Sequence, residues 1–107
     1  MNISGMARNY IAKYFSSEDF LVHVSKTVER QLQEWNTSYE VIVMKVENYH
    51  WNVKIDERYY ELHLTEEEIK VLQKRDPYAL DRRIWKELKA QGLPIKYGDG
   101  NYLDLVL

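Results

Sequence analysis

Cysteine is absent from the 107 residues of this chain, which excludes disulfide bonds, thiolate metal sites and cysteine nucleophiles. Proline and glycine are scarce, with two and four residues. Three of the four glycines lie at or after Gly92, so residues that interrupt helices and strands are rare before it. We expect the middle of the chain to be almost continuous secondary structure.

Motifs of common catalytic and phosphate-binding sites are also absent. The chain has no G-x-S-x-G motif, no serine after Ser38, and neither a G-x-G-x-x-G nor a P-loop pattern. The "GDGN" segment at 98–101 has no predicted helix after it and lacks the acidic positions of a calcium loop, so we interpret it as a turn. We predict no catalytic residue, no cofactor and no metal, and therefore a protein that is not an enzyme.

Long apolar runs are missing, since no stretch approaches the ~20 residues that a membrane span requires. The N-terminal segment also lacks a continuous apolar stretch of signal-peptide length. Hydrophobic residues make up 45% and charged residues 30%, with a net charge of −2, as is typical of a folded globular domain. We expect one cytoplasmic domain over residues 1–107, with no membrane partner.

Helical spacing of apolar residues is present in four segments. It predicts helices over residues 3–15 and 18–35, the second preceded by a serine cap and opened by acidic residues. The "TEEE" segment at 65–68 is a capping box that begins a third helix. Asp76 is predicted to cap a fourth helix, which Gly92 ends.

Between the second and third helices the apolar spacing changes to two. It predicts three strands, "YEVIVMKVE", "YHWNVKID" and "RYYELHLT", joined as antiparallel hairpins because the links are too short for crossovers. The C-terminal "PIKYGDGNYLDLVL" predicts a further hairpin between 95–97 and 102–107. The expected order is α-α-β-β-β-α-α-β-β, an α+β fold with helices packed on an antiparallel sheet.

The register of the second hairpin has two solutions that keep its apolar residues on one face. A loop at 57–58 places Lys54 opposite Glu61, whereas a loop one residue earlier places His50 opposite His63. We favour the first solution because it forms a cross-strand ion pair and separates the two histidines.

In the first hairpin, a loop at 47–48 pairs Met44 with Trp51. The first strand is apolar on both sides, which predicts a central position with cover on both faces. The buried face is then predicted to hold Ile42, Met44, Val46, Tyr49, Trp51, Val53, Ile55, Tyr60, Leu62 and Leu64. The opposite face is predicted to hold Tyr39, Val41, Val43, Lys45, His50, Asn52, Lys54, Tyr59, Glu61 and His63.

Part of the opposite face is a candidate interaction surface. Its residues on the second and third strands mix tyrosine with polar side chains, and tyrosine is enriched at interfaces because it offers apolar area with a polar tip. We predict a regulatory or protein-interaction module that binds an unidentified protein or a second copy of itself. The candidate residues are Tyr59, His63, His50, Asn52 and Lys54.

Histidine is a common zinc ligand, so His50 and His63 are candidates for a metal site. A site also requires further ligands, and the favoured register separates these two residues. We interpret them as surface histidines. His23 lies off the apolar stripe of its helix and is predicted to face solvent.

A nucleic-acid-binding domain is the alternative function. Arg82, Lys86 and Lys89 recur at helical spacing and form a possible basic stripe, which Asp81 and Glu87 dilute. The net negative charge also gives little long-range attraction to nucleic acid, so this partner is not favoured.

The α-β-β-β-α order also resembles that of double-stranded-RNA-binding domains. Those domains present lysines at the start of the helix after the third strand. Here that position reads Thr65-Glu66-Glu67-Glu68, whose charge repels phosphate. The function is therefore not carried over from this resemblance.

Overall fold

The computed structural model describes residues 1–98 and 100–107. These residues form the predicted α+β fold with an antiparallel sheet, which has three strands in the order β1-β2-β3. The elements in chain order are α1 (Gly5–Tyr14), α2 (Ser17–Trp35), β1 (Glu40–Val46), β2 (Asn48–Ile55), β3 (Arg58–Leu64), α3 (Glu66–Arg75), α4 (Ala79–Ala90) and α5 (Tyr102–Val106).

The helix starts follow from capping side chains. Ser16 accepts a hydrogen bond from the Asp19 amide at the start of α2, and Thr65 accepts one from the Glu68 amide at the start of α3. Each bond satisfies one of the amides that a helix start leaves without a partner. Both predicted caps are therefore confirmed.

The prediction that Asp76 caps α4 is wrong. Asp76 follows the last residue of α3, and its carboxylate accepts the Tyr78 amide at 2.8 Å and pairs with Arg82. This local turn delays α4 until Ala79. Gly92 follows α4 with a φ of +89°, a conformation that glycine adopts without strain.

The predicted C-terminal hairpin is also wrong, because residues 102–106 form α5 instead. Tyr102, Leu103 and Val106 are buried, and their spacing places them on one side of a short helix. The predicted turn at 98–101 includes Asp99, which lies outside the described residues. The helix α5 begins directly after this segment, whereas the sequence predicted no helix there.

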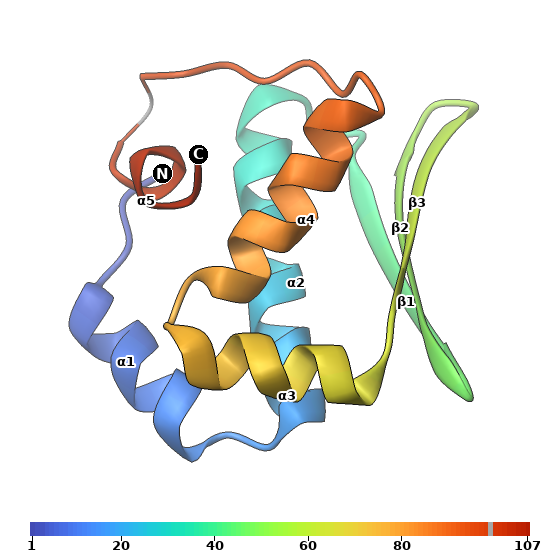
Figure 1. Ribbon diagram of the computed structural model, residues 1–107. Coiled ribbons are helices and arrows are strands. Elements are labelled where there is room, and N and C mark those ends of the chain that lie inside the picture. Colours follow the sequence, from blue (N-terminus) through green and yellow to red (C-terminus); the bar gives the residue numbers. More distant parts are fainter. Residues whose placement is uncertain (99) are drawn as a thin grey trace.

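The helices lie on one side of the sheet, and its other side faces away from them (Figure 1). Trp51 and Val53 of β2 and Leu64 of β3 are fully buried on the helix side. Trp51 also donates its indole N–H to the Ser25 hydroxyl of α2 at 2.9 Å. The N-terminal segment runs beside α5, where the Tyr102 amide bonds the Met1 carbonyl at 3.1 Å.

The observed register of the second hairpin is the one not favoured above. The strands turn at Asp56, whose φ is +52°, and His50 lies opposite His63. The expected cross-strand ion pair is replaced by a cation–π contact, with the Lys54 ammonium 5.9 Å from the Tyr59 ring centre. Both registers place the same apolar side chains on the buried face, so the turn at Asp56 decides between them. The solvent-exposed ion pair does not decide the register, as expected from the small free energy of such pairs.

The register of the first hairpin also differs from the prediction, which reverses the faces of β1. Glu47 alone links β1 to β2 with a φ of +65°, and Val43 lies opposite Trp51. A shift of one residue moves every side chain of a strand to the other face. Tyr39, Val41, Val43 and Lys45 therefore leave the predicted outer face, and Ile42, Met44 and Val46 leave the predicted core.

The predicted central position of this strand is also wrong, because β1 is an edge strand. The apolar residues on its two faces are therefore not both covered by the described residues. Met44 and Val46 remain 52% and 66% exposed.

Candidate interaction surface

The side of the sheet that faces away from the helices is termed the outer face. It carries all five predicted interaction residues, because His50, Asn52 and Lys54 alternate along β2 while Tyr59 and His63 lie opposite them on β3. Tyr59 is 55% exposed. The outer face consists of Glu40, Ile42, Met44, Val46, Asn48, His50, Asn52, Lys54, Tyr59, Glu61 and His63.

His50 and His63 are brought together, contrary to the favoured register. The Nδ1 atom of His50 lies 3.2 Å from the Nε2 atom of His63, and the two rings meet edge to face. One ring nitrogen must donate and the other must accept in this contact. In the described part of the chain, no group of three or more His, Asp or Glu side chains is arranged to hold a metal ion.

The edge of β1 is partly satisfied by α2. Glu29 accepts the Val41 amide at 2.8 Å, and Gln33 donates to the Tyr39 carbonyl at 2.9 Å. Main-chain groups alternate in direction along a strand, so the amide and carbonyl of Val43 and Lys45 also point away from β2. We term Val43, Met44 and Lys45 the open edge.

The opposite edge of the sheet is covered differently. The Gln91 side chain after α4 donates to the Glu61 carbonyl at 2.7 Å and accepts the Glu61 amide at 3.2 Å. The side-chain amide of Gln91 therefore makes the two hydrogen bonds to Glu61 that a neighbouring strand would make at the centre of β3.

A shallow groove runs between α2 and the inner side of β1. It has a volume of about 260 Å³, and its apolar wall consists of Val22, Val41 and Val43. Lys26 and Glu29 provide the charged side chains of this groove. The open edge is thus flanked by apolar side chains on both faces of the sheet.

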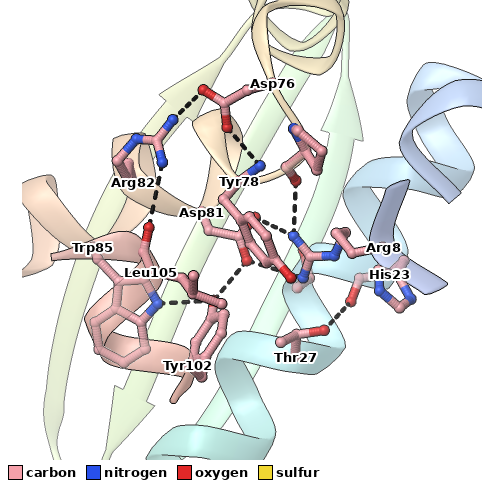
Figure 2. A network of polar contacts seen from close by, with 12 residues as sticks. Arg8, His23, Thr27, Asp76, Tyr78, Asp81, Arg82, Trp85, Tyr102 and Leu105 are labelled. Carbon is pink, nitrogen blue, oxygen red and sulfur yellow. Dashed lines mark hydrogen bonds and ion pairs between the residues drawn. The ribbon is translucent and has the colours of Figure 1, made fainter. Parts of the chain in front are cut away.

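A buried polar network joins three helices on the other side of the molecule (Figure 2). The guanidinium of Arg8 in α1 forms a two-pronged ion pair with the Asp81 carboxylate in α4. Tyr102 of α5 donates its hydroxyl to Asp81 at 2.6 Å and accepts the Trp85 indole N–H at 3.0 Å. Arg8 also donates to the Pro77 carbonyl at 3.0 Å.

Burial determines the ionisation behaviour of this network. It raises the pKa of Asp81, while the hydrogen bonds from Arg8 and Tyr102 favour the carboxylate and oppose the rise. Burial and the neighbouring Asp81 charge raise the pKa of the Tyr102 hydroxyl well above its ordinary value. Tyr102 therefore remains a hydrogen-bond donor at physiological pH.

The sequence did not predict this network. Its charge pattern predicts Asp81 as a surface charge that dilutes the basic stripe, whereas Asp81 is fully buried. The spacing contained a signal, since Asp81 lies four residues before Trp85 and seven before Leu88, on the apolar stripe of α4. Nothing in the local sequence singles out Arg8 as its partner.

One residue of the predicted basic stripe, Arg82, forms an ion pair. Arg82 pairs with Asp76 and donates to the Leu105 carbonyl at 3.3 Å. Lys86 and Lys89 are exposed on α4. The neighbouring Arg83 contacts acidic side chains on both sides, Glu68 at 3.2 Å and Glu87 at 3.8 Å.

No family model, curated protein or solved structure matches this chain. In the described residues, no helix has the length and apolar character needed to cross a membrane.

Proposed function

We propose that this chain is a non-enzymatic protein-interaction module that associates through the open edge of β1. The observation that carries the proposal is an edge strand with apolar side chains on both faces. Among the described residues, the outward main-chain groups of Val43 and Lys45 have no hydrogen-bond partner. Such an edge is a template for another strand. The outer face beside it, with Tyr59, His63, His50, Asn52 and Lys54, is the polar continuation of the same surface.

We further assign a second copy of the chain as the occupant. Glu29 and Gln33 already occupy the first half of the edge, so pairing must use Val43 to Lys45. An antiparallel two-fold axis at Met44 places Val43 of each copy opposite Lys45 of the other. Their main-chain groups then exchange hydrogen bonds in both directions, and the existing bond between Glu29 and Val41 is kept.

The side chains are also self-complementary in this register. On the outer face, Met44 meets Met44 of the other copy, and Ile42 meets Val46. On the inner face, Lys45 enters the groove beside α2 of the other copy, where its stem covers apolar surface and its ammonium approaches Glu29. The contact therefore buries side chains that a single copy leaves exposed.

The nucleic-acid alternative receives less support from the contacts on α4. The ion pairs of Arg82 and Arg83 with Asp76, Glu68 and Glu87 reduce the positive field beside Lys86 and Lys89.

Charge substitutions at Met44 test the two-fold arrangement. Met44→Lys and Met44→Glu each place like charges opposite each other across the axis, so each variant should self-associate about tenfold more weakly than the original chain, a loss of about 1.4 kcal/mol. Mixing the two variants pairs lysine with glutamate and should restore association. Sedimentation velocity over a concentration series would measure both effects against the 12.9 kDa single chain.

Tyr59→Glu is the matched control, because Tyr59 is 55% exposed and Met44 is 52% exposed on the same face. Tyr59 lies two strands from the proposed axis, so this variant should self-associate like the original chain. A loss confined to Tyr59→Glu would move the contact to the outer face of β3. Single chains at all concentrations would contradict self-association altogether.

A further inference from the structure

A second hollow lies on the helical side of the molecule, between the N-terminal part of α1 and the middle of α2. Its volume is about 230 Å³. Three of its lining side chains are basic, namely Arg8, His23 and Arg30, and none is a carboxylate. The remaining lining residues are Asn2, Ile3, Ser4, Ala7, Ile11 and Thr27.

The charge of Arg8 is not fully hidden from this cavity by its ion pair. Asp81 lies on one side of the guanidinium and His23 lies on the other (Figure 2). The carboxylate therefore faces the core, and the cationic group stands between it and the cavity. Arg30 is exposed and adds a second positive charge from α2.

The pKa of His23 is sensitive to these positive charges. Burial, followed by the charges of Arg8, Arg30 and Lys26, lowers the pKa of His23 from 6.5 to about 4. The imidazole is therefore neutral at physiological pH. It is half-buried, whereas the sequence predicted a solvent-facing position. A negative charge in the cavity would oppose the effect of the three cations on the pKa of His23 and would favour the imidazolium.

We propose that this cavity binds a small oxyanion, and that a phosphate group fits it best. Arginine donates to phosphate and carboxylate oxygens in a fixed fork geometry, which suits Arg30 at the rim. The Ser4 hydroxyl accepts the Ala7 amide at 3.2 Å and keeps its own proton for donation into the cavity. Binding is coupled to protonation of His23, so this coupling raises the affinity as the pH falls toward the pKa of about 4 of the imidazole in the free chain.

Proton NMR of the three histidines in the full chain tests this site, with His23 assigned from a His23→Gln variant. In inorganic phosphate, the pKa of His23 should rise by about one unit or more relative to sodium chloride of equal ionic strength. The chloride sample removes the contribution of simple screening. A parallel acetate series distinguishes an oxyanion site that also accepts carboxylates from one that requires phosphate.

Arg30→Gln removes the exposed cation without disturbing the buried pair, and it should abolish most of the phosphate-induced shift. Arg75→Gln, an exposed arginine at the end of α3, is the matched control and should leave the shift unchanged. An identical pKa of His23 in phosphate, acetate and chloride would overturn the proposal. A shift that survives Arg30→Gln would also overturn it.

Discussion

Asp81→Ala should lower the free energy of unfolding by about 3–5 kcal/mol, since removing one partner leaves the other as an uncompensated buried charge. Arg8 is 3% exposed and Asp81 is fully buried. The substitution also removes the acceptor of the Tyr102 hydroxyl. Urea unfolding followed by tryptophan fluorescence would measure the change.

The exposed carboxylate of Asp104 in α5 is the matched control, and Asp104→Ala should change the stability by less than about 0.5 kcal/mol. Replacing both partners, as in Arg8→Met with Asp81→Leu, should recover a substantial part of the loss because no buried charge remains. If Asp81→Ala costs no more than the Asp104 control, the network does not hold α1, α4 and α5 together.

Trp51→Ala should also cost about 3–5 kcal/mol, as expected when a large buried aromatic side chain leaves a cavity. Trp51 is fully buried between the sheet and α2, and its indole N–H bonds Ser25. Chemical unfolding would measure the loss.

Val46→Ala serves as the comparison for Trp51→Ala. It removes an apolar side chain that is 66% exposed on the neighbouring strand, and it should cost less than about 0.5 kcal/mol. A loss below about 1 kcal/mol for Trp51→Ala would contradict its place in the core.

Local patterns were sufficient to predict most elements of the fold. The apolar stripe of α2 and the caps at Ser16 and Thr65 depend on residues within one or two turns, so they can be recognised without tertiary contacts. The C-terminal hairpin failed because "YLDLVL" fits both periods over so few residues. Its helix is selected by contacts with distant residues, including the bond from Tyr102 to Asp81.

The faces of β1 were not predictable in the same way. Ile42, Val43 and Met44 are all apolar, so alternation gives no preference for either face. The turn at Glu47 decides the register. Glu47 has a positive φ, which is uncommon for a residue other than glycine and cannot be predicted from the neighbouring sequence.

The sequence predicted the part of the candidate surface on β2 and β3 but not the part on β1. The five outer-face residues on β2 and β3 share one face as expected. Trp51 and Leu62 point into the core, so the residues that alternate with them on each strand point outward. The open edge of β1 was missed, since its discovery requires the strand order and the bonds that Glu29 and Gln33 make to the main chain. The His23 cavity likewise depends on the packing of α1 against α2.

Cysteine placed at the proposed two-fold axis tests self-association through β1 most directly, because the chain has no cysteine of its own. In the proposed register, Met44 faces Met44 of the other copy across a pair with Cα atoms about 4.5 Å apart, within the range that a disulfide spans. Val46→Cys is the matched control on the same strand, since its two copies would lie roughly 14 Å apart. Under mild oxidation, Met44→Cys should form a disulfide-linked dimer much faster than Val46→Cys, as measured by non-reducing electrophoresis over time. Equal and slow cross-linking of the two variants would contradict pairing of β1 with β1.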